Sequence, residues 1–123
     1  MKKEETIENY LETIHILSLD RKNVKAIDVA NYLKFSRPTV SVALKNLEDE
    51  KYLKFDGYNI ILTDKGLKIA KSMYERHEYI AGLLIKLGVD EKIAYHDSCL
   101  IEHDLSPESF EAIKNAHKHI FKK

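Results

Sequence analysis

The chain has 123 residues, of which 44% are hydrophobic and 33% charged, and its formal net charge is zero. These values are ordinary for a soluble globular protein of one domain or two very small ones. The sequence has no run approaching the roughly 18 consecutive apolar residues that a membrane span needs, and the one cysteine excludes an internal disulfide. No apolar stretch follows the basic N-terminal residues, so we expect a cytoplasmic protein without a secretory signal.

The zero net charge hides an uneven distribution along the chain. Residues 21–71 carry eleven Lys and Arg against six Asp and Glu, a net of +5, whereas residues 1–20 and 72–123 have nets of −3 and −2. A polyanion would therefore bind the middle third, and cations would suit the acidic flanks. A solvated surface without any such partner also gives an excess of this size.

Apolar residues at helical spacing predict three helices before residue 50. The first covers residues 4–19 and the second is short, over residues 27–33. The third begins at Pro38, where the missing N–H costs nothing, with Ser36 or Arg37 just outside it. The buried stripe of the third helix is expected to comprise Val40, Ala43, Leu44 and Leu47.

A β-hairpin is predicted next. Two β-prone runs, residues 52–55 and 58–63, flank Asp56-Gly57, a dipeptide that favours a tight type I′ turn. Helix, helix, turn, helix and hairpin in the first half of the chain is the layout of a winged helix-turn-helix. In such a module the third helix enters the major groove of DNA.

The N-terminal end of a recognition helix usually reaches the base edges, and nearby lysines meet phosphates. Candidate DNA-binding residues are therefore Ser36, Arg37, Pro38, Thr39, Ser41 and, on the hairpin, Lys54. Further basic residues of the surrounding elements are Lys25, Lys34, Lys45 and Lys51. A winged helix used only for protein contacts is the alternative for this segment.

Three more helices are predicted in the second half of the chain. Thr63 can cap a long helix over residues 64–87, which Gly88 ends. Asp90 opens a shorter helix, and Ser106-Pro107 begins the last one. The apolar positions of the last helix are Phe110, Ile113, Ile120 and Phe121.

Potential metal ligands lie on one side of the helix that Asp90 opens. They are His96, Cys99, Glu102 and His103, and they fall within an arc of about 120° on a helix that turns about 100° per residue. Ile93, Leu100 and Ile101 lie on the other side and form an apolar face for packing. The alternative is the solvated side of an amphipathic helix, but free Cys usually prefers burial, which favours a site for a divalent transition metal.

The chain resembles the metal-dependent regulators of the diphtheria toxin repressor and manganese transport regulator family. The matching pieces, which run in family order, are Asn9-Tyr-Leu-Glu-Thr-Ile14, Ser36-Arg-Pro-Thr-Val-Ser41, Leu62-Thr-Asp-Lys-Gly66, Arg76-His77-Glu78 and Cys99-Leu-Ile-Glu-His103. The resemblance implies a mainly α fold. A winged helix-turn-helix DNA-binding domain would cover residues 1–70, and a helical dimerisation and metal-binding domain residues 71–123.

The resemblance also implies a metal site built from three helices. Its residues would be Asn9, Glu12, His77, Cys99, Glu102 and His103. The contribution of His96 stays open, because the ancillary-site His of iron-responsive relatives falls one residue earlier, at Tyr95. The remaining histidines are interpreted as surface residues: His15, His117 and His119.

The chain also departs from the family pattern. Manganese-tuned members resemble it at Glu12, but have Asp at the position of Asn9 and Glu at that of Cys99. Iron-tuned members resemble it at Cys99, but have Met at the position of Asn9 and Glu at that of Ala81. A hybrid site with a weak or absent ancillary site is implied. Relatives usually have a polar or basic base-reading residue at the position of Val42.

The sequence thus predicts a homodimeric repressor of metal-uptake genes that binds a double-stranded DNA operator with a divalent metal as corepressor. Because a thiolate favours softer ions, Fe2+ is expected ahead of Mn2+, which prefers oxygen donors. One alternative is a metal-independent winged-helix regulator that responds to a small molecule or to oxidation of Cys99. The other is a small metallohydrolase with Glu102 as general base, although a helical bundle of this size offers little substrate cleft.

Overall fold

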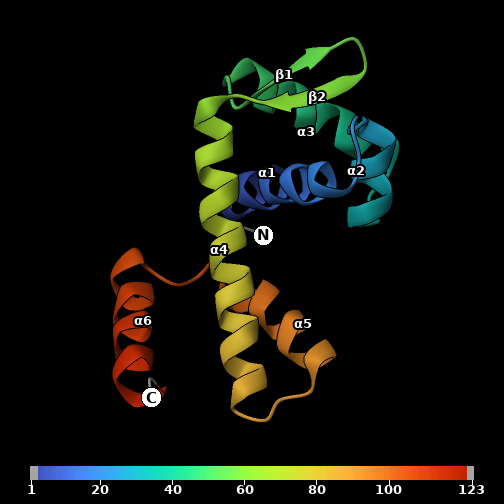
Figure 1. The fold of residues 1–123 in the computed structure, drawn as a ribbon. Helices are drawn as coiled ribbons and strands as arrows, with labels where there is room; N and C mark the ends of the chain where they lie inside the picture. The colour runs from blue at the N-terminus through green and yellow to red at the C-terminus, as the bar shows by residue number, and fades with distance from the viewer. Residues whose placement is uncertain (1–2, 122–123) are drawn as a thin grey trace. The chain divides into compact units, whose positions relative to one another are not determined.

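The computed structural model describes residues 3–121, and it is mainly helical with one two-stranded antiparallel sheet (Figure 1). Its elements are α1 (Lys3–Asp20), α2 (Ala26–Leu33), α3 (Arg37–Asp49), β1 (Leu53–Asp56), β2 (Asn59–Leu62), α4 (Asp64–Lys86), α5 (Glu91–Ile101) and α6 (Pro107–Phe121). The chain falls into two compact units that meet between Tyr74 and Glu75, and α4 contributes to both. The domain boundary expected after residue 70 remains a prediction. Among the described residues, no helix combines the length and apolarity that crossing a membrane requires.

The first unit is a winged helix-turn-helix, as the sequence predicted. Helices α1, α2 and α3 and the hairpin share one hydrophobic core, in which Leu11, Val29 and Val40 have no exposed surface. The segment between α1 and α2 adds to the hairpin, because the backbone of Val24 accepts from Ile60 N and donates to the side chain of Asn59. These contacts fix the hairpin beside the helices that support α3.

The recognition helix α3 begins one residue earlier than expected. Ser36 is its N-cap, and its Oγ accepts a hydrogen bond of 3.2 Å from Thr39 N. Arg37 is therefore the first helical residue, and Pro38 lies within the first turn, where its missing N–H costs no helical bond. The predicted buried stripe is confirmed for Val40, Leu44 and Leu47, which are at most 4% exposed.

The hairpin turn differs from the prediction. Asp56 pairs with Asn59, so the two-residue loop is Gly57-Tyr58 instead of Asp56-Gly57. Of these two loop residues, only Gly57 has a positive φ, of +63°. A type I′ turn needs positive φ at both central residues, whereas type II′ needs it only at the first, usually a glycine. The turn therefore has the pattern of type II′.

Both ends of α4 are set by the residues that the sequence singled out. Thr63 Oγ1 accepts from Gly66 N and donates to Lys51 O, which ties the start of α4 to the turn that follows α3. At the other end Gly88 has a φ of +103°, and the N–H of Val89 reaches back to Leu84 O. This is the left-handed closure that commonly ends helices at glycine.

Gly66 should be the glycine at which a side chain is tolerated least. A Cβ at this position would lie 2.1 Å from Tyr52 O, whereas a Cβ on Gly82, within the same helix, would meet nothing within 4 Å. We expect Gly66→Ala to lower the free energy of unfolding by roughly 1–3 kcal/mol, the usual cost of overpacking. Gly82→Ala should raise it by roughly 0.5–1 kcal/mol through helix propensity. Urea unfolding followed by circular dichroism measures both, and equal midpoints for the two variants would refute this packing argument.

The second unit consists of the C-terminal half of α4 with α5 and α6 flanking it (Figure 1). Small buried residues, Ala94 and Ser98 of α5 and Ala81 of α4, permit close packing. From α6, Phe110 is buried and contacts the ring of Tyr79 edge to face. Of the other apolar positions predicted for α6, Ile113 is half-buried, and Ile120 and Phe121 lie outside the described side chains.

Candidate functional site

Four predicted ligands come together in the second unit. His77 Nδ1 lies 2.9 Å from Glu102 Oε2 and 3.7 Å from Cys99 Sγ. The other carboxylate oxygen, Glu102 Oε1, lies 3.3 Å from His103 Nε2. Glu102 is only 1% exposed, so its carboxylate is buried between two imidazoles. We call this group, His77, Cys99, Glu102 and His103, the ligand cluster.

The helix that was predicted to supply three of these residues is shorter than expected. Helix α5 ends at Ile101, Glu102 is its C-cap with αR backbone angles, and His103 lies in the following turn. The expected arc of four ligands on one helix is therefore wrong in detail. His96 is exposed, and the residue before it, Tyr95, packs its ring against the imidazole of His77 at 5.5 Å between centroids.

The electrostatics of the ligand cluster favour a positive charge. The pKa of His77 is raised to about 10. The largest cause is its hydrogen bond with Cys99, followed by its hydrogen bond with Glu102 and the negative charge of Glu102, and these outweigh the lowering of the pKa by partial burial. A cation is thus stabilised at the atom where the imidazole, the thiol and the carboxylate meet. A buried acid left without a positive partner would instead carry a large desolvation cost.

The ligand cluster fits a divalent transition metal. Two nitrogens, a carboxylate and a sulfur are the donors that such ions bind in proteins. Ligand atoms that each lie about 2.0–2.3 Å from one ion stand roughly 3–4 Å apart, and the measured separations of 2.9, 3.3 and 3.7 Å agree with that value. Each distance joins one pair of side chains, so the four donors would converge on a single ion only after side-chain rearrangement.

The two remaining predicted ligands belong to the first unit. Asn9 is half-buried and Glu12 is 4% exposed, and both lie on α1 three residues apart, so that they share one side of the helix. A buried acid on a helix whose other buried residues are mainly apolar is unusual. The low exposure of Glu12 therefore excludes the position of an ordinary surface acid for this residue.

Two supporting residues received no role from the sequence. Ser98 Oγ donates a hydrogen bond of 2.6 Å to the backbone carbonyl of His77 and so aligns α5 with α4. Arg76 is 7% exposed, and its Nη1 donates to the backbone carbonyls of Glu102 and Leu105. Arg76 thereby holds the turn that carries Glu102 and His103 against α4. Only the position of Arg76 next to His77 could have drawn attention to it.

Replacing Arg76 with Ala should weaken metal binding by roughly 10–100-fold, as is typical when a residue that orients ligands is lost. Lys114→Ala is the matched control, because Lys114 also lies over the Phe110 ring but contacts neither carbonyl of the turn. Competition with a fluorescent chelator measures the affinity, and Arg76→Lys should recover part of it. If Arg76→Ala loses thermal stability but binds metal as the wild type does, Arg76 supports only the fold.

Two histidines that the sequence placed at the surface are partly buried. The His117 ring contacts Tyr79, with 2.6 Å between Nδ1 and the phenol oxygen. His15 packs edge to face on Tyr74, and burial and the charge of Lys71 lower the pKa of His15. The surface interpretation is wrong for both, while His119 lies outside the described side chains. Neither His15 nor His117 joins the ligand cluster.

The candidate DNA-binding residues lie where a DNA surface could reach them. Those at the start of α3 are exposed, as is Lys54 on β1: Ser36, Arg37, Pro38, Thr39, Ser41 and Lys54. Ser36 Oγ also donates to Thr39 Oγ1 at 2.8 Å. This bond engages the hydroxyl proton of Ser36 and leaves that of Thr39 available.

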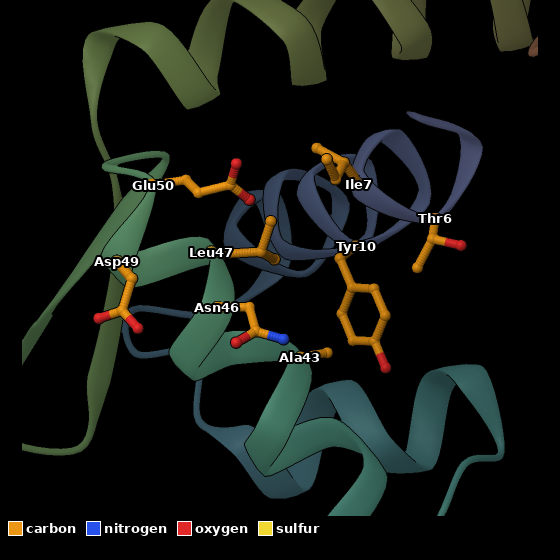
Figure 2. Close-up of a pocket in the computed structure, with 8 residues that line it drawn as sticks. All are labelled: Thr6, Ile7, Tyr10, Ala43, Asn46, Leu47, Asp49 and Glu50. Carbon is orange, nitrogen blue, oxygen red and sulfur yellow. The ribbon is translucent and has the colours of Figure 1, made fainter. Parts of the chain in front are cut away.

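The first unit also contains a pocket between α1 and α3, of about 410 Å3 (Figure 2). Ile7, Tyr10 and Leu47 give it an apolar floor, while Asp49 and Glu50 stand at its edge. The pocket contains none of the predicted ligands or DNA-binding residues, so it is separate from both candidate sites.

The apolar side that the sequence identified on α5 is exposed in the single chain. Ile93, Leu100 and Ile101 are 54%, 62% and 38% exposed, and Leu87, just before α5, is 61% exposed. Ile93 and Leu100 are seven residues apart and so lie on the same side of α5, and exposed apolar surface of this kind is typical of contacts with another protein chain. We call these four residues the α5 apolar face.

Comparison with known proteins covers both units. Residues 3–60 match the family model described as the N-terminal DNA-binding domain of iron-dependent repressors. Residues 63–122 match the model described as their metal-binding and dimerisation domain. The first match ends within β2, and the second begins at Thr63, directly before α4.

Curated relatives match most of the chain. An HTH-type transcriptional regulator of Methanocaldococcus jannaschii is 34% identical over 89% of this chain and 90% of its own length. The HTH-type transcriptional regulator MntR of Bacillus subtilis is also 34% identical, over 88% of this chain and 77% of its own.

Solved structures show the same fold in longer chains. The manganese regulator SloR superimposes with a TM-score of 0.77 and 27% identity, and ScaR with bound Zn2+ with a TM-score of 0.74 and 26% identity. Each comparison covers 89% of this chain and 52% of the other. This chain thus spans about half the length of these two regulators.

Proposed function

Because this chain belongs to the family of iron-dependent repressors, we propose that it is a homodimeric, metal-dependent transcriptional repressor. It binds a double-stranded DNA operator more tightly when a divalent transition metal, Fe2+ or Mn2+, occupies its second unit. The regulated genes are those of metal uptake, and the protein acts in the cytoplasm, where the chromosomal operator is. Family membership also argues against a metallohydrolase and against a metal-independent regulator.

The observation that carries this proposal is the ligand cluster, in which the carboxylate of Glu102 is buried. Its carboxylate contacts two imidazoles, and its thiol lies beside one of them. An ordinary core gains nothing from burying Glu102, since replacing such ionic groups by apolar ones is often neutral or stabilising. A role in binding a cation accounts for the burial of the Glu102 carboxylate.

We assign the metal to His77, Cys99, Glu102 and His103, with Asn9 and Glu12 as further ligands, as the resemblance implies. When bound, the metal supplies the positive charge that these acidic and neutral donors favour. Asn9 and Glu12 come from the DNA-binding unit, so their participation would couple metal binding to the spacing of two recognition helices. That coupling requires different metal affinities in the two arrangements.

On DNA, the exposed start of α3 is proposed to read base edges. Arg37 can make two hydrogen bonds to a guanine, and the free hydroxyl proton of Thr39 can meet an acceptor. Lys54, on the hairpin, would contact phosphate and contribute to the salt dependence of binding. Two half-sites about 34–36 Å apart, or a multiple of that, suit a dimer.

The metal is proposed to be Fe2+ ahead of Mn2+, because Cys99 contributes sulfur and Asn9 only a neutral oxygen. Cys99→Glu should therefore shift the response toward Mn2+, which prefers oxygen donors, and Cys99→Ala should weaken the response to both metals. The metal concentration for half-maximal DNA binding, measured anaerobically, tests this. If the wild type responds to Mn2+ at lower concentration than to Fe2+, and Cys99→Ala leaves both responses unchanged, the thiol is not a ligand.

Selection from a random DNA library tests the function and identifies the operator sequence at the same time. The purified chain is incubated with the library in Mn2+, in Fe2+ under anaerobic conditions, and in chelator. We expect enrichment of a two-fold symmetric sequence with metal and much weaker enrichment in chelator. Enrichment of the same sequence to the same extent in all three conditions would refute metal dependence.

A further inference from the structure

Val42 is an exposed residue of α3 whose side chain cannot form the hydrogen bonds on which base recognition usually relies. Val42 is 62% exposed, whereas the other large hydrophobic residues of α3, Val40, Leu44 and Leu47, are buried. Its side chain offers three carbon atoms and neither donor nor acceptor. Every other exposed residue near it on the outer surface of α3, except Pro38, has a polar group: Thr39, Ser41, Lys45 and Asn46.

The helical position of Val42 places it at the centre of this outer surface. At about 100° per residue, Val42 lies roughly 40° from Pro38 and 60° from Lys45 around the axis. The buried residues Val40 and Leu44 each point about 160° away from it and are at most 1% exposed. A helix that enters a groove with its outer surface must therefore bring Val42 against the bases.

Of the groups that base pairs present in the major groove, the C5-methyl of thymine is the apolar one. A valine against a base edge without that methyl would cover polar atoms and leave their hydrogen bonds unmade, which is costly. A valine against thymine instead removes two apolar surfaces from water. Single exposed valines are common on protein surfaces. A valine at the centre of a recognition helix, however, faces the base pairs, where the thymine methyl is the apolar group that it can contact.

We propose that Val42 is a specificity-determining residue that selects thymine through its methyl group at one position of each half-site. This inference rests on the proposed function, because it takes α3 as the helix that enters the major groove. It goes beyond that function in naming a base and the atom by which the base is selected.

Deoxyuridine substitution tests the proposal, since it removes the thymine methyl and changes nothing else. Each thymine of the selected operator is replaced in turn, in both half-sites together, and affinity is measured by fluorescence anisotropy in saturating Mn2+. At one position, substitution should lower the affinity of the wild type by roughly fourfold per half-site, which is the effect of burying one methyl group. For both half-sites together the affinity should fall by about 16-fold. Substitution of the other thymines should lower the affinity much less.

Val42→Ala supplies the second half of the test. This variant should bind the thymine and uracil operators with nearly equal affinity, because the contact is already gone. Leu19→Ala is the matched control: Leu19 is 57% exposed but lies on α1, so this variant should keep the wild-type preference for thymine.

Three results would overturn the proposal: an operator without thymine in its half-sites, a wild type indifferent to every substitution, or Val42→Ala with undiminished preference. Failure of the proposed function, metal-dependent DNA binding, would give different results. If the wild type binds no DNA in Mn2+ or Fe2+, both proposals fall. If it binds but ignores the methyl groups, only the role of Val42 falls.

Discussion

Glu102→Gln is expected to abolish metal-activated DNA binding while leaving the chain folded. The amide has the shape of the carboxylate but lacks its charge, and both carboxylate oxygens face imidazoles, at 2.9 Å from His77 and 3.3 Å from His103. Loss of a ligand should lower metal affinity by more than the roughly 10–100-fold that loss of an orienting partner costs. Competition with a fluorescent chelator gives the metal affinity, and anisotropy of labelled operator gives the DNA affinity.

The control for this change is Glu78→Gln. Glu78 follows His77 on α4 and is exposed, with a hydrogen bond of 3.2 Å from Tyr95 OH and no contact with Glu102. It should bind metal and DNA as the wild type does. Equal losses in both variants would mean that general negative charge, instead of the ligand cluster, governs the metal response.

Ile93→Asp is expected to convert the dimer into a monomer. Ile93 is 54% exposed in the single chain and belongs to the α5 apolar face, where a charge would be buried without a partner on dimerisation. The change should not harm α5 itself, because an acidic residue is favourable in the first turn of a helix. Sedimentation equilibrium measures the mass. Operator affinity should fall by roughly 10²–10⁴-fold, since the second half-site no longer contributes.

Leu19→Asp is the control for adding a negative charge at an exposed apolar position outside the α5 apolar face. Leu19 is 57% exposed on α1, so the variant should remain dimeric and bind the operator. A monomeric wild type, or an Ile93→Asp variant that dimerises normally, would place the dimer contact elsewhere than on the α5 apolar face.

Local signals in the sequence predicted most of the element boundaries. Thr63, Asp90 and Ser106 each accept a backbone N–H at a helix start, as their residue types indicate. The hairpin turn was wrong by one residue because its register also depends on a distant contact. Asn59 accepts from Val24 N, 35 residues away, and so belongs to the strand beside Asp56.

The residue types of the ligand cluster were predictable from the sequence, but their geometry was not. Spacing placed Cys99 and Glu102 on one side of α5, while the proximity of His77 depends on the packing of α5 against α4. The role of Arg76 could not be read from the sequence, because it is expressed through two backbone carbonyls more than 25 residues away. Periodicity also identified the apolar side of α5 but could not tell packing within one chain from packing between two.

The most direct test of metal control is the affinity of the wild-type chain for its selected operator with and without metal. Fluorescence anisotropy in excess chelator, then in Mn2+, then in Fe2+ under anaerobic conditions gives three dissociation constants at fixed ionic strength. A coupling free energy of about 1–3 kcal/mol corresponds to roughly 5–150-fold, and we expect tighter binding with either metal by at least the lower value. Equal dissociation constants in chelator and in both metals would contradict the account.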